Sequence, residues 1–242
     1  MKSLFCLLMI FCIHSSYAQT NTGKLKTNAD DNTLLWEISG NGLAAPSYLF
    51  GTFHLLCKED INVSPALKQA IINSREVYLE LDMDDPATLM GGLMLMNMKG
   101  GKKLKDLYPP EAYKRVLDYF KDSLQTPLGF FQGMKPEFLI ALLYPKMMPC
   151  RTASSVEEEV MQLAKAGEKE IKGLETMAFQ ASLFDSIPYE KQAEELLSAI
   201  DSMEKSKAYF GLMLSAYKMQ RLDEIEKITL NPEFGFEDNR DM

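Results

Sequence analysis

The sequence is poor in histidine, with only two among its 242 residues, and it has a single tryptophan. Beyond its N-terminal segment it has no apolar run of the ~20 residues that a membrane helix needs. It contains no phosphate-binding loop, nucleophile elbow, dinucleotide fingerprint or repeat of fixed period. The formal net charge of −8 argues against nucleic acid as a partner. The scarcity of histidine makes each one a conspicuous candidate for metal binding or proton transfer.

Residues 1–18 have the pattern of a signal peptide. Lys2 precedes an apolar run over residues 4–13, and a small-x-small cleavage pattern follows at Ser16-Tyr17-Ala18. We expect cleavage after Ala18 and export to the periplasm or the extracellular space, with no transmembrane segment in the mature protein.

Only Cys57 and Cys150 remain after that cleavage. In an oxidising compartment two cysteines can form one disulfide. Two separate thiols, far apart in the sequence, fit the pattern equally well.

The β-type segments come early in the chain and alternate with helical ones. Residues 19–33 are polar and aperiodic and predict a flexible tail, followed by one domain over residues 34–242. Leu34–Ile38 and Ser47–Phe50, with a glycine-rich turn between them, predict a β-hairpin. Further strands are predicted at residues 77–82 and 169–174.

Helices are predicted over residues 65–74, 86–144 with breaks, 156–166, and 189–229 with interruptions near Gly211 and Gln220. Strands before and between helices predict an α/β fold. We expect a central mixed β-sheet flanked by helices, with a large helical portion between and after the strands.

Three polar residues lie at or just past the ends of the predicted strands: His54, Glu80 and Glu175. Open α/β sheets bind ligands along the carboxyl edge of their strands. His54 is therefore a candidate metal ligand or acid/base, and Glu80 and Glu175 are candidate ligands or general bases.

Each of these residues also has a purely structural interpretation. His54 can be a turn histidine whose ring binds backbone groups. Glu80, within an apolar strand, can pair with a basic side chain. Glu175 can cap the helix that starts near Thr176, because carboxylates favour helix N-termini.

The same residues resemble motifs of the TraB/GumN family, which includes the TIKI-type metalloproteases. The matching pieces are Leu34–Ile38, Ser47-Tyr48-Leu49-Phe50-Gly51-Thr52-Phe53-His54, Val77–Asp82 with Glu80, and Gly173-Leu174-Glu175-Thr176 followed by Gln180. The resemblance implies an α/β domain with two Gly-x-x-His motifs. It also implies that their histidines and a glutamate form the divalent-metal site of the peptidase members.

This sequence supplies the first motif as Gly51 and His54, and the glutamate as Glu80, but it has no second Gly-x-x-His. Residues 238–242 resemble the family helix that precedes the second motif. We therefore expect the family's last strand and helix to be missing, together with one histidine ligand, through truncation or frameshift.

The resulting hypothesis is an exported peptidase or hydrolase that uses a divalent metal such as manganese, cobalt or zinc and acts on a peptide or protein. His54 and Glu80 are its expected metal ligands, Glu80 and Glu175 its expected catalytic residues, and Gly51 and Gln180 support the motif. Two alternatives stay open: a non-catalytic protein that binds a peptide or another ligand, and an inactive fragment.

Overall fold

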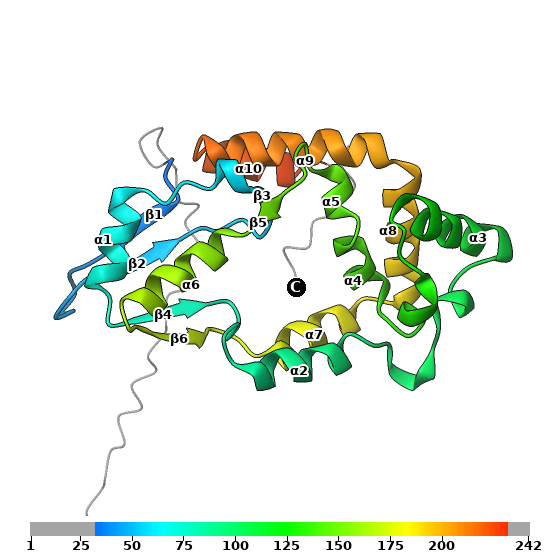
Figure 1. Cartoon of the computed structure of the whole chain (residues 1–242), viewed down its shortest axis with the longest axis horizontal. Helices are drawn as coiled ribbons and strands as arrows, with labels where there is room; N and C mark the ends of the chain where they lie inside the picture. Colours follow the sequence, from blue (N-terminus) through cyan, green and yellow to red (C-terminus); the bar gives the residue numbers. More distant parts are fainter. Residues whose placement is uncertain (1–31, 232–242) are drawn as a thin grey trace, which may run out of the picture.

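The computed structural model describes residues 32–231, which form a mixed α/β fold (Figure 1). The strands are β1 (Leu35–Ile38), β2 (Ser47–Phe50), β3 (Leu56–Cys57), β4 (Glu76–Leu79), β5 (Ala153–Ser154) and β6 (Glu170–Gly173). The helices are α1 (Pro65–Asn73), α2 (Pro86–Leu95), α3 (Pro110–Asp118), α4 (Pro136–Ala141), α5 (Tyr144–Met147), α6 (Val156–Ala166), α7 (Met177–Ser186), α8 (Tyr189–Asp201), α9 (Met203–Lys218) and α10 (Leu222–Thr229). The predicted signal peptide, nearly all of the predicted tail and residues 238–242 lie outside the described residues.

The described strands form three two-stranded sheets. β1 and β2 form the predicted antiparallel hairpin, with Leu35 opposite Phe50. β4 and β6 pair in parallel, and the short strands β3 and β5 pair antiparallel. The predicted α/β class and the large helical portion are confirmed, although the strands of the described residues do not join into one continuous central sheet.

Polar side chains fix the starts of the helices that lie beside these strands. Ser64 accepts a hydrogen bond from the backbone N–H of Leu67 at the start of α1, and Ser155 accepts one from Glu158 at the start of α6. Thr176 does the same for Phe179 in α7. These caps satisfy N–H groups that have no partner within the helix.

The predicted interruption near Gly211 is wrong, because α9 runs through this residue from Met203 to Lys218. A glycine inside a helix costs only about 1 kcal/mol relative to alanine. Burial of Phe210, Leu214 and Tyr217 on the same helix outweighs that cost. The second predicted interruption is confirmed: Gln220, with φ of 55°, separates α9 from α10.

Several helices pack in pairs, one of these pairs beside the small sheets and the others away from the strands. α1 packs against α6, α2 against α7, and α4 against α8 (Figure 1). The core includes Phe120, Leu139 and Leu196, all fully buried.

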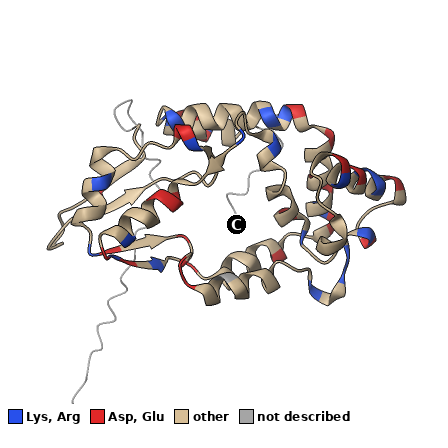
Figure 2. Ribbon diagram, viewed as in Figure 1, with Lys and Arg blue, Asp and Glu red and all other residues tan. Residues whose placement is uncertain are grey.

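Among the described residues no helix is long and apolar enough to cross a membrane. Charged residues of both signs are spread over many elements in Figure 2.

One basic side chain is buried inside this helical portion. Lys135 is 1% exposed, and its ammonium group lies 2.9 Å from Asp185 Oδ1 and donates a hydrogen bond to the carbonyl of Ala181. Asp185 also contacts Lys99 and accepts a hydrogen bond from Tyr189. Burial raises the pKa of Asp185, but the three donors outweigh it and lower the pKa to about 2. The cluster ties the C-terminal half of α7 to the start of α4.

Replacing Asp185 with asparagine should strongly destabilise the protein, because it leaves the buried Lys135 charge without a counterion. Breaking such a pair lowers the free energy of unfolding by about 3 kcal/mol or more. Asp118→Asn is the matched control: it breaks an exposed ion pair with Lys114, and should leave stability nearly unchanged. Urea unfolding of both variants measures the difference. Equal stabilities would contradict a structural role for the buried pair.

Candidate functional site

The candidate site is held together by the β3–β5 ladder. Leu56 pairs with Ser154 and Cys57 with Ala153. His54 lies just before β3, and Glu157 lies in the first turn of α6, just after β5. The ladder therefore brings together two side chains that are 103 residues apart in the sequence.

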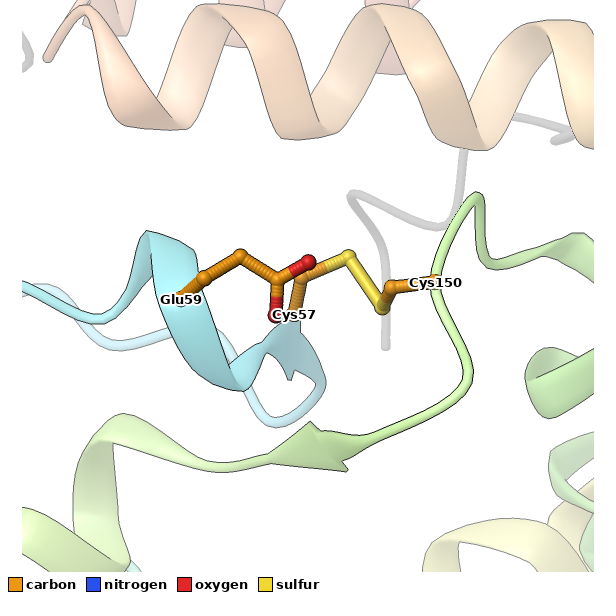
Figure 3. A group of neighbouring side chains, drawn as sticks. All are labelled: Cys57, Glu59 and Cys150. Carbon is orange, nitrogen blue, oxygen red and sulfur yellow. A yellow bond between two sulfur atoms is a disulfide. The ribbon is translucent and has the colours of Figure 1, made fainter.

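A disulfide between Cys57 and Cys150 closes this ladder, so the paired-cysteine interpretation holds in the structure. Figure 3 shows the two sulfurs joined, with the side chain of Glu59 close by. Cys57, Glu59 and Cys150 are the only group of three within residues 32–231 whose potential ligand atoms all lie within 4.8 Å of one another. Because metal binding requires the thiolate, the disulfide excludes this group as a metal site in the oxidised protein.

The central contact of the site is a hydrogen bond between His54 Nδ1 and Glu157 Oε1, at 2.7 Å. An ionised carboxylate only accepts hydrogen bonds, so Nδ1 must carry the proton. In neutral His54 the lone pair is then on Nε2. A carboxylate behind the histidine is the usual arrangement around a metal-binding imidazole, because it fixes the ring and its tautomer.

The two partners shift each other's titration. The hydrogen bond to Glu157 raises the pKa of His54 above its ordinary value of 6.5, although burial opposes it. Burial raises the pKa of Glu157, but hydrogen bonds from His54 and Thr52 outweigh it and lower the pKa to about 2. Glu157 Oε2 is buried and has no hydrogen-bond partner among the described residues.

On the other side of the ring, Nε2 faces Glu80. The distance from His54 Nε2 to Glu80 Oε2 is 3.9 Å, and the same oxygen accepts a long hydrogen bond of 3.5 Å from Gln180. The side chain of Glu80 is 61% exposed, so it does not form the buried ion pair that an apolar strand would require. The strand ends at Leu79, which places Glu80 just past it.

The structure therefore brings His54, Glu80 and Gln180 together at one end of a hollow of about 1270 Å³. Glu175 lies differently: its backbone N–H binds the carbonyl of Glu80 at 2.9 Å, while its exposed side chain is not among the residues that line the hollow. Its closest link to the site is therefore through the backbone of Glu80.

Two glycines shape the backbone beside the site. Gly51 donates a hydrogen bond to Leu34 and accepts one from Tyr217, so it anchors the turn that carries His54. At Gly173 a Cβ would lie 2.7 Å from the backbone nitrogen of Asp82. Only glycine therefore allows the chain after β6 to approach the chain after β4 this closely.

The donor set suits a divalent metal. Bonds of about 2.0–2.2 Å to nitrogen and oxygen allow one ion to contact both His54 Nε2 and Glu80 Oε2 across their 3.9 Å separation. Glu157 was not among the predicted site residues, because Glu157, Glu158 and Glu159 are equally typical of the first turn of a helix.

Glu157→Gln should lower the pKa of His54, because the variant loses the negative charge that raises it and keeps only a neutral acceptor. The pKa can be followed from the His54 ring resonances in NMR spectra of a chain that starts after the predicted cleavage site. Glu158→Gln is the control, since Glu158 contacts Ser154 and not His54. An unchanged His54 pKa in Glu157→Gln would contradict the described hydrogen bond.

The same pair gives stability a defined pH window. The raised pKa of His54 contributes stability that is complete below pH 6.5 and is lost as pH rises through the folded-state pKa. The lowered pKa of Glu157 contributes above pH 4.5 and is lost as pH falls towards about 2. The contribution of the pair to stability is therefore greatest between pH 4.5 and pH 6.5. Glu157→Gln should remove that maximum.

Comparison with known proteins finds similarity to metalloproteases. The chain is 34% identical to Metalloprotease TIKI1 of Danio rerio over 131 residues, which is 51% of this chain and 25% of the relative. It is 33% identical to Metalloprotease TIKI1 of Homo sapiens over 114 residues, 46% of this chain and 22% of the relative. The aligned part thus spans about a quarter of these relatives. No solved structure shows a significant match.

A family match covers nearly all of the predicted domain, from residue 34 to residue 241. It includes every residue placed at the site above. The chain belongs to the TraB/PrgY/gumN family.

Proposed function

We propose that this protein is an exported, divalent-metal-dependent peptidase whose site is built on His54 and Glu80. The observation that carries the proposal is the row Glu157–His54–Glu80, in which a carboxylate fixes the ring and Nε2 faces a second carboxylate. Similarity to the TIKI metalloproteases supports the reaction class and suggests a protein substrate. The signal-peptide pattern of residues 1–18 supports export.

His54 Nε2 and Glu80 Oε2 would hold the ion, with manganese, cobalt or zinc as candidates. A bound ion would lower the pKa of its water and polarise a substrate carbonyl. Glu157 accepts a hydrogen bond from Nδ1 of His54, so the lone pair on Nε2 points away from Glu157. Gln180 orients Glu80 by donating a hydrogen bond from its side-chain amide. Glu80 can alternatively act as a general base, with the backbone of Glu175 holding it in place.

Metal binding can be tested by thermal unfolding. Manganese, cobalt or zinc should raise the melting temperature, because a ligand at 100 times its Kd stabilises the folded state by about 2.7 kcal/mol. His54→Ala should abolish the rise; because the variant also removes the hydrogen bond to Glu157, the rise is measured against the variant's own melting temperature without metal.

Glu59→Ala is the matched control, because it alters the Cys57–Glu59–Cys150 group and leaves His54 in place. The rise should persist in this variant. A rise that survives in His54→Ala and disappears in Glu59→Ala would move the metal to the cysteine group and reject the proposed site.

Peptidase activity is tested with a library of unstructured peptides and the purified protein. Cleavage should require the metal, stop with EDTA and be lost in His54→Ala and Glu80→Gln, because both variants remove a ligand atom. Glu158→Gln should cleave normally, since that residue is directed at Ser154. Metal-independent cleavage would contradict the mechanism.

A second candidate function is non-catalytic binding of a peptide. It is favoured by the small number of converging donors: no group of three that includes His54 lies within 4.8 Å in the described part of the chain. Peptide binding without any cleavage, at saturating metal, would support this alternative over the peptidase.

A further inference from the structure

The turn that carries His54 is held by two helices. The ring of His54 binds Glu157 at the start of α6. The preceding residue, Phe53, packs instead on α9: its ring centroid lies 5.3 Å from that of Tyr217 and 5.7 Å from that of Phe210. The side chain of His54 is thus bound by α6, while the chain just before it is held by α9.

Tyr217 makes a second contact with this turn. Its hydroxyl donates a hydrogen bond to the carbonyl of Gly51, at 3.1 Å. Tyr217 is buried, burial raises the pKa of its phenol, and the negative charge of Glu157 raises that pKa further. The hydroxyl therefore stays protonated and remains a donor at neutral pH. One side chain thus contacts both the residue directly before His54 and the residue three positions before it.

The end of α9 is itself held in place on both sides of Tyr217. Lys218 forms an ion pair with Asp60, in the 3-10 turn that follows β3. The side chain of Gln220 accepts a hydrogen bond from the backbone N–H of Leu34, next to β1. These contacts fix α9 against the segments before and after the His54 turn. Tyr217 therefore projects from a supported helix end.

The ring of His54 depends on its backbone for its position, because its side chain is 73% exposed. Nδ1 lies 2.7 Å from Glu157 Oε1, and Nε2 lies 3.9 Å from Glu80 Oε2. A hydrogen bond is lost beyond about 3.5 Å, so a displacement of the ring by about 1 Å would break the first contact. A small movement of the turn is therefore enough to separate His54 from Glu157.

We propose that Tyr217 is a positioning residue for His54. By binding Gly51 and packing on Phe53, it fixes the backbone from which the ring reaches its two carboxylate partners. Residues that bind a ligand need such support from a second set of contacts, because a loose ring spends less time in the productive orientation. The inference rests on the proposed function only for its consequence, which is metal binding at Nε2.

The test is the tautomer of the neutral His54 ring in Tyr217→Phe. This variant keeps the ring that packs on Phe53 and removes the hydroxyl that binds Gly51. In the unaltered protein the proton is on Nδ1, because Glu157 accepts it. In the variant the ratio of the Nε2–H form to the Nδ1–H form should rise about fivefold, as expected when one ordinary hydrogen bond is lost.

Ring nitrogen NMR spectra of the full chain, recorded above the pKa of His54 and without metal, distinguish the two forms. The signals that are missing from the spectrum of His54→Ala are those of His54. Phe53→Leu should raise the same ratio, since it keeps an apolar side chain and loses the ring contacts with α9.

Tyr108→Phe is the matched control. The hydroxyl of Tyr108 also donates to a backbone carbonyl, that of Ala193 on α8, at 2.7 Å. In Figure 1, α8 lies at the opposite side of the molecule from β2, which leads into the His54 turn. The control should therefore lose a comparable amount of stability in urea unfolding and leave the tautomer of His54 unchanged.

Two results would overturn the inference. One is an unchanged tautomer ratio in Tyr217→Phe, which would mean that the hydroxyl does not hold the ring. The other is an equal rise in Tyr108→Phe, which would mean that any loss of stability releases His54. Because the tautomer is measured without metal, the inference and the proposed function fail separately.

Discussion

The site depends on the hydrogen bond between His54 and Glu157, and that bond depends on the β3–β5 ladder. The ladder has only two residues in each strand, too few to persist alone. The Cys57–Cys150 disulfide closes it at one end, and the packing of α1 against α6 supports it at the other. The disulfide and the helix packing thus hold the exposed side chain of His54 in one orientation. A turn on the surface without these supports would not do so.

The sequence predicted the parts of the site that belong to strand ends. His54, Glu80 and Gln180 follow apolar runs or lie one turn into a helix, and the structure brings them together. Glu157 was missed because nothing local distinguishes it from the two glutamates that follow. Its role comes from a contact over 103 residues, and a single sequence does not encode such pairing in any periodicity.

The fold was predictable to a similar extent. The hairpin and the capped helices follow from turn residues, alternation and Ser-Pro signals, all of which act locally. The continuity of α9 through Gly211 was not, because buried neighbours such as Phe210 and Leu214 override a weak propensity. The division of the strands into separate pairs also depends on long-range packing. Among the described residues, this division places β2 and β4 in different sheets although both lead into the site.

A carboxylate behind a metal-binding histidine has two opposing effects. It makes the imidazole a stronger ligand, and it also raises the pKa of His54, so protons compete better for Nε2. Below that raised pKa the protonated ring donates from both nitrogens and contacts two carboxylates, Glu157 and Glu80, with no lone pair for an ion. Above it, Glu157 still accepts from Nδ1–H, and the free lone pair on Nε2 faces Glu80 alone. In the metal site proposed above, His54 and Glu80 would therefore form an ion pair in acid and be free to bind an ion at higher pH, with the change set by the hydrogen bond to Glu157.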